Sequence, residues 1–226
     1  MTPVTAASAT TLPGRLRRAR WYHPEWTVAV VAAAAWTLTI VAPGHGGAGW
    51  AVMAAAMMLP PALPAVRRVA MSGKWARRGR AAAGFAAAYL AVWALYGTVL
   101  LACVRWSQVP AHADGPLVAA LLTAALWELT PYKRRWVRAG HRTPPLPPDG
   151  WRADRACLLA GLRHGGASVG ACWALMLPMT VTAHLHLPLM ILLTAIAVAE
   201  ESLVKGTRLT HASATALLLA ALVIAV

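Results

Sequence analysis

Three methionines stand close together in the uncharged stretch WAVMAAAMMLPPALP, which runs from Trp50 to Pro64. Met53 and Met57 are four residues apart and therefore share one face of a helix, with Met58 beside them. Thioether sulfur is a soft ligand that selects Cu(I). Methionines also fill gaps in ordinary apolar cores. The stretch by itself leaves both roles open.

A second pattern lies later in the chain, where polar and sulfur-bearing side chains recur at steps of four. His164, Ser168, Cys172 and Met176 form a slowly rotating stripe on one helical face. Facing the methionine stretch, the stripe would complete a Cu(I) site of two or three sulfurs and one nitrogen. The glycines and alanines around it equally fit a tight helix-packing face with an inert thiol. The candidate ligands for copper are Met53, Met57, Met58, Cys172, Met176 and His164.

Histidines fall in the short segments between apolar runs. His45, His112, His184 and His186 all lie in segments that the charge pattern below places outside the membrane. Imidazole nitrogen binds copper in either oxidation state. These residues are expected either to filter copper where it enters or to be ordinary solvated loop residues.

Carboxylates stand at the ends of two apolar runs, at Glu128 and at the pair Glu200 and Glu201. Carboxylates inside a membrane are costly and are usually paired or functional. Lys133, Arg163 and Lys205 are available partners at similar depth. We expect an ion pair that clamps helices together.

The composition indicates the kind of protein that must position these groups. Of the 226 residues, 59% are hydrophobic and 12% are charged, and the apolar runs are helix-length. The predicted fold class is therefore an all-α, polytopic transmembrane helix bundle. Cys103, Cys157 and Cys172 are too scattered for a disulfide framework. The net charge of +14 is typical of cytoplasmic loops, and we expect no nucleic-acid partner.

Seven spans are expected, over residues 26–41, 49–66, 81–104, 116–130, 156–181, 187–203 and 212–226. Residues 1–25 form a basic cytoplasmic arm, and residues 26–226 form the bundle. A Pro-rich, basic cytoplasmic loop covers 131–155, and its prolines predict an extended middle.

The basic residues sort by side. Every Lys and Arg except Arg105 falls on one side of the seven spans. The positive-inside rule then places the amino terminus in the cytoplasm of a multi-pass protein of the bacterial plasma membrane. In that orientation Met53, Met57 and Met58 lie in the outer half of the membrane, and Cys172 and Met176 lie in its middle and outer half.

Several segments together resemble a known family. In order they read WAVMAAAMMLPPALP, GFAAAYLAVWALYG, WELTPYKRR, HRTP, GLRHGGASVGACWALM and AEES, and they cover about residues 50–205. This pattern resembles a bacterial family of predicted metal-binding integral membrane proteins of unknown function, sometimes labelled copper chaperones.

The resemblance implies cysteines at positions where this chain has other residues. After the fourth span Lys133, Arg142 and Pro144 match the family, but Trp136 and Gly140 or His141 stand where two cysteines would be. On the fifth span Ser168 and Ala171 replace two of three cysteines, and Cys172 remains. Most thiol ligands on the cytoplasmic side are therefore gone from this member, unless His141 and His164 take their place.

The leading hypothesis is a membrane protein that binds Cu(I) in the outer half of the bundle and handles or moves copper. Its partners would be the lipid bilayer and other membrane or periplasmic proteins. A second hypothesis is a non-catalytic subunit or assembly factor of a larger membrane complex, without bound metal. A third is an enzyme whose cofactor does redox chemistry inside the bundle. No nucleotide-binding loop, HExxH motif or nucleophile–base pattern is present to favour an enzyme.

Overall fold

The structure is a computed structural model that describes residues 22–42, 44, 46–108, 114–142, 145–181, 186–202 and 207–225. All regular elements within these residues are helices, which confirms the all-α class. The helices are α2 (Trp26–Val41), α3 (Gly46–Met71), α4 (Arg78–Ser107), α5 (Asp114–Leu129), α6 (Pro131–Gly140), α7 (Gly150–Cys172), α8 (Pro178–Val181), α9 (His186–Ser202) and α10 (Thr207–Ala225). Two 3₁₀ turns, η1 (Trp75–Arg77) and η2 (Ala174–Met176), complete the described elements.

Two of the described helical segments are long and apolar enough to cross a membrane, Gly46–Met71 and Trp75–Ser107. Trp26–Val41 and Thr210–Ala225 are apolar but shorter. Each expected span coincides with at least part of a helix in the structure. The number of membrane crossings stays a prediction.

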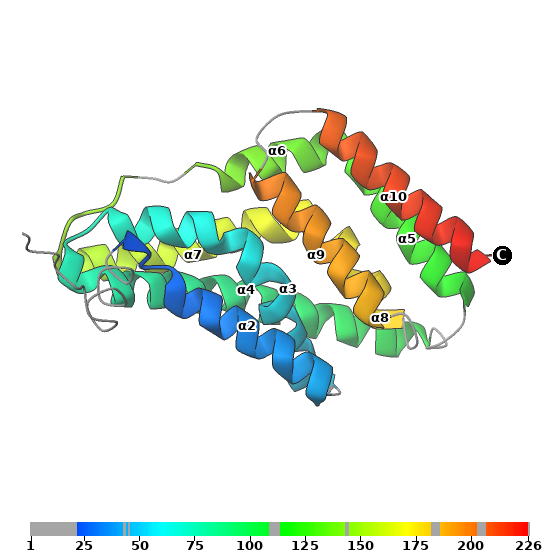
Figure 1. Ribbon diagram of the computed structural model, residues 1–226, viewed down its shortest axis with the longest axis horizontal. Helices are drawn as coiled ribbons and strands as arrows, with labels where there is room; N and C mark the ends of the chain where they lie inside the picture. The colour runs from blue at the N-terminus through cyan, green and yellow to red at the C-terminus, as the bar shows by residue number, and fades with distance from the viewer. Residues whose placement is uncertain are drawn as a thin grey trace, which may run out of the picture.

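Helix α3 lies at the centre of the fold. It packs against α2, α4 and α9, while α7 packs along α4 and under α6, and α5 pairs with α10 (Figure 1). Helix α3 continues through Pro60, Pro61 and Pro64 instead of ending there. Proline removes a backbone donor, so extra donors are needed nearby. The Tyr89 hydroxyl of α4 donates to the Met58 carbonyl at 3.0 Å, next to the Met57 carbonyl that Pro61 leaves without its helical donor.

The expected fifth span is not one helix, and this corrects the stripe drawn through Met176. Helix α7 ends at Cys172, and the chain then runs through η2 and the short α8. Pro178 explains the break, because it lacks the N–H that would bond to the carbonyl of Ala174 and its ring crowds that carbonyl. Two carbonyls near the break accept hydrogen bonds from side chains of neighbouring helices. The Trp127 indole donates to the Ala171 carbonyl at 3.1 Å, and the Tyr96 hydroxyl donates to the Trp173 carbonyl at 2.8 Å.

Small residues on α7 bring it close to its neighbours, as the sequence predicted. A methyl group at Gly161 would collide with the Phe85 carbonyl of α4, and one at Gly165 would come within 3.0 Å of Val92. At Gly170 a methyl group would collide with the ring of Trp136, which α6 lays across α7. The small-residue face is thus filled by the chain's own α4 and α6.

The basic loop 131–155 contains more helix than expected. Helix α6 begins where the Thr130 side chain accepts a hydrogen bond from the Lys133 amide, with Pro131 in the first turn. Beyond α6, the described residues 145–149 are non-helical, in agreement with the expected extended middle. Salt bridges then fasten the start of α7 to the segment before α4. Lys74 pairs with Asp149, and Arg77 and Arg80 both pair with Asp154.

Candidate metal-handling site

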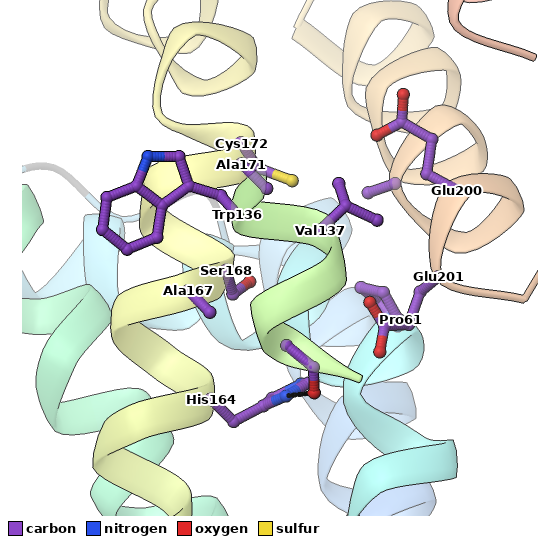
Figure 2. A pocket seen from close by; sticks show the side chains of 12 residues that line it. Pro61, Trp136, Val137, His164, Ala167, Ser168, Ala171, Cys172, Glu200 and Glu201 are labelled. Atoms are coloured by element: carbon purple, nitrogen blue, oxygen red, sulfur yellow. Dashed lines mark hydrogen bonds between the residues drawn. The ribbon is translucent and has the colours of Figure 1, made fainter. Parts of the chain in front are cut away.

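One face of α7 lines a small pocket that is closed by three other helices. His164, Ser168 and Cys172 line it from α7, and Pro61 lines it from α3. Figure 2 shows α6 across one side, with Trp136 and Val137, and the end of α9 across the other, with Glu200 and Glu201. The cavity volume is about 20 Å³, which suits an ion or a water molecule and not an organic substrate.

His164 is fixed in one orientation. Its Nδ1 lies 3.1 Å from the Gly140 carbonyl, and its ring lies 5.5 Å from the ring of Phe85 and 5.6 Å from that of Tyr89. A carbonyl can only accept, so Nδ1 must carry the proton. In the neutral ring Nε2 then keeps its lone pair, the arrangement found in metal-binding histidines.

Cys172 lies at the other end of the same pocket. It is buried, as is Cys157, while Cys103 is exposed, and all three thiols are free. Two helical turns separate His164 from Cys172, which is a rise of about 12 Å along the axis. A single ion could therefore not be held by both side chains.

The three methionines of α3 are buried beside the segment of α7 from Ser168 to Cys172. Tyr89 marks the level of Met58 and Ser168, because its hydroxyl donates to the Met58 carbonyl and accepts from Ser168 Oγ, both at 3.0 Å. Tyr96 marks the next level along α4, since it lies 6.2 Å from the ring of Trp50 and binds the Trp173 carbonyl. The candidate sulfur ligands that lie between these two levels are Met53 and Met57 on α3 and Cys172 on α7.

The methionines do not line the pocket. Met57, Met58 and Met176 are fully buried in the apolar core, and Met53 is nearly so. Pro61, one turn after Met57, is the residue of α3 that reaches the pocket wall. The structure thus brings His164 and Cys172 to one cavity and leaves the thioethers in the packed layer beside it.

A cluster of buried charges stands beside Cys172. The Lys133 ammonium of α6 pairs with Glu128 of α5 and, at 2.7 Å, with Glu200 of α9. This confirms the expected clamp between helices, with Lys133 as the partner. One oxygen of each carboxylate, Oε2, is buried without a hydrogen-bond donor. Next to the cluster, His141 contacts the Glu201 carbonyl oxygen at 3.2 Å.

The chain is also similar to a known protein family. A family model named PpoB2 and described as copper chaperone matches residues 47–224. The chain belongs to the PpoB2 copper chaperone family. No curated protein and no solved structure matches the chain. The PpoB2 match begins with α3 and ends within α10, so it includes the pocket and every candidate ligand.

The residues of this PpoB2 member fit copper in part. A thiol and an oriented imidazole line an ion-sized cavity, and soft thioethers lie at the same level. Within the described residues, no three His, Cys, Asp or Glu side chains converge as a metal cluster would require. His45, His112 and His184, the expected outer histidines, lie outside the described part, and His186 is the first residue of α9.

Sequence reasoning missed the walls that α6 and α9 give to the pocket. Trp136 and Val137 come from a segment expected to be loop, and Glu201 was noted only as a charge near the membrane surface. One signal for α6 was present, because Thr130 and Pro131 form the start of a helix whose polar and apolar residues then alternate with helical spacing.

Proposed function

We propose that this protein is a multi-pass plasma-membrane protein that receives Cu(I) in the pocket on α7 and passes it to sulfur ligands deeper in the bundle. The observation that carries the proposal is the ion-sized cavity lined by both His164 and Cys172. Imidazole nitrogen and thiolate sulfur both bind Cu(I), and thiolate sulfur selects it over harder cations. Copper is the cargo in this proposal and not a resident cofactor.

The identity of the other lining residues supports the same location. Trp136, Gly140, Ser168, Ala171 and Cys172 all line this cavity. The family resemblance implies cysteines at Trp136, Ser168, Ala171 and Cys172, and at either Gly140 or His141. Relatives with cysteines there would hold a thiol-rich site in one place. This chain would keep one thiol and bind copper more weakly and more exchangeably.

The proposed direction runs from His164 toward the level of Met53 and Met57. His164 lies toward the basic end of the molecule, which the charge rule places in the cytoplasm. Cys172 lies deeper, and Met53, Met57 and Met58, buried beside this part of α7, would take the metal from it, with Met176 as a further sulfur ligand. A chain of weak, exchangeable sulfur ligands suits hand-over better than one tight site does.

The test is Cu(I) binding by the full-length protein in lipid nanodiscs, measured by competition with a chromophoric chelator. Cys172→Ala should weaken binding by about tenfold or more, since even loss of a metal's outer-shell partner costs about 10–100-fold. Met57→Leu, which conserves volume, should weaken retention while leaving the fold intact. Cys157→Ala is the matched control, a buried thiol on the same helix away from the pocket, and should bind as the wild type does. Equal affinities for the wild type, Cys172→Ala and Met57→Leu would disprove the proposal.

The assembly-factor hypothesis loses one of its two supports. It required the small residues of α7 to form a contact surface for another protein. Gly161, Gly165 and Gly170 instead meet α4 and Trp136 of the same chain. No comparable observation favours redox catalysis in the pocket.

A further inference from the structure

A second cavity lies beside the first and shares two residues with it. His164 and Gly140 line both, so His164 stands between them. Ala65, Val69 and Phe85 form apolar walls of the second cavity, and Arg142 and Arg163 line it with charge. We call this second cavity the arginine vestibule.

The arginine vestibule is positively charged and lacks acidic lining residues among those the structure describes. Arg142 and Arg163 are exposed, and neither forms a salt bridge with any described carboxylate. In contrast, the basic residues at and before the start of α4, Lys74, Arg77 and Arg80, are all paired with aspartates. Arg68 adds to the positive field at His164.

A positive mouth repels a bare copper cation and attracts an anion. Through the arginine vestibule, Cu(I) can therefore approach His164 favourably as part of a complex whose own charge is negative. Arginine is also the side chain best shaped to hold a carboxylate, because its planar guanidinium donates two parallel hydrogen bonds.

We propose that the arginine vestibule is the loading site for Cu(I) carried by a small thiol that bears carboxylates. Arg142 and Arg163 would hold the carboxylates while the thiolate presents copper to Nε2 of His164. This inference rests on the proposed function and adds the chemical class of the copper donor. Both cavities are too small to admit the carrier itself, so its carboxylates would bind the exposed Arg142 and Arg163 at the mouth while only the copper reaches His164.

The transfer is a ligand exchange without change of oxidation state. The carrier's copper–sulfur bond breaks as copper bonds to Nε2 of His164 and then to Sγ of Cys172. The Cys172 thiol loses its proton, and the released carrier thiolate takes up one proton. Copper enters and leaves the step as Cu(I), so no oxidant or reductant is required.

The experiment compares two copper donors that share one thiol. Glutathione carries two carboxylates, and its diethyl ester carries none. Full-length protein in nanodiscs is mixed with the Cu(I) complex of each, and protein-bound copper is measured over time after rapid desalting. The wild type should load from glutathione about tenfold faster than from the ester, a modest steering effect. This preference should shrink as salt is added.

Arg142→Gln combined with Arg163→Gln should abolish the preference, while equilibrium Cu(I) affinity stays within about twofold of wild type. Arg152→Gln combined with Arg155→Gln removes the same charge from the start of α7, outside the vestibule lining, and should retain the preference. Equal loading from both donors in the wild type, or a preference that survives the vestibule variant, overturns this inference alone. A wild type that binds no copper in the chelator assay overturns the proposed function and this inference together.

Discussion

Lys133 donates to two carboxylates from a side chain that is fully buried. Lys133→Met would leave Glu128 and Glu200 without their shared cation in an apolar surrounding. Removing one partner of a buried ion cluster usually costs about 3–5 kcal/mol. We expect a loss of this size in the free energy of unfolding, measured by denaturant titration in detergent.

Lys74→Met is the matched control for that variant, because Lys74 also pairs with an acidic residue but from a mostly exposed position. Exposed pairs contribute little to stability. The interpretation of Lys133 as a structural clamp would be wrong if the two variants unfolded alike.

The start of α7 should loosen only in strong acid. A hydrogen bond from Arg77, helped by Arg80, holds the pKa of Asp154 below its usual value, and Lys74 does the same for Asp149. A lowered pKa gives stability that is complete above the usual Asp value of about 3.9 and is lost as the pH falls through the lower, folded value.

Hydrogen exchange of residues 74–80 should therefore stay constant from pH 7 to about pH 5, after correction for the intrinsic rate, and rise below about pH 4. Asp154→Asn should show the faster exchange at every pH. Loosening of the wild type already near pH 6 would contradict the assignment to these aspartates.

At the scale of the helices, two glycines of α7 offer a matched pair. A methyl group added at Gly170 would collide with Trp136, whereas one added at Gly166 would lie in open space. Gly170→Ala should push α6 away from the pocket and speed the loss of bound Cu(I) to a chelator several-fold. Gly166→Ala should leave that rate unchanged and add about 0.5–1 kcal/mol of stability through helix propensity. Identical release rates would show that α6 does not retain the metal.

The helices show which parts of the fold can be predicted from the sequence. Apolar runs between basic segments predicted at least part of each long helix in the described part, because such runs are stable as helices in an apolar setting, although α7 begins earlier and ends earlier than the expected fifth span. The stripe from His164 to Cys172 was predicted from its spacing, which local geometry fixes. The predicted stripe does not continue to Met176, because Pro178 disrupts the helical turn that precedes it.

The rest of the site depends on contacts between segments that are distant in the chain. Lys133 meets Glu200, and Trp136 fills the space above Gly170. Lys133 was among the three cations expected as partners, but the contact of Trp136 with Gly170 is not marked by any local pattern. The candidate thiol and imidazole were therefore found from the sequence, whereas the walls that make their surroundings a pocket were not.

At the scale of the whole molecule, the proposed topology places the two ends of α4 on opposite sides of the membrane. In a variant without native cysteines, Ser107→Cys should react with a membrane-impermeant thiol reagent in intact cells. Ser72→Cys, just before η1, should react only in inverted vesicles. Both residues are exposed in the structure, so accessibility within the protein does not decide the result. Labelling of both from the same side would refute the orientation.

The two tyrosines of α4 limit the kinds of motion that can accompany copper transfer. Tyr89 ties the Met58 carbonyl to Ser168, and Tyr96, packed near Trp50, ties α4 to the Trp173 carbonyl. Sliding α3 past α7 by even one helical step would break these ties at two heights simultaneously. A piston-like mechanism is thereby disfavoured. In the proposed transfer, copper would advance by rotation of side chains within a rigid frame and not by rearrangement of the bundle.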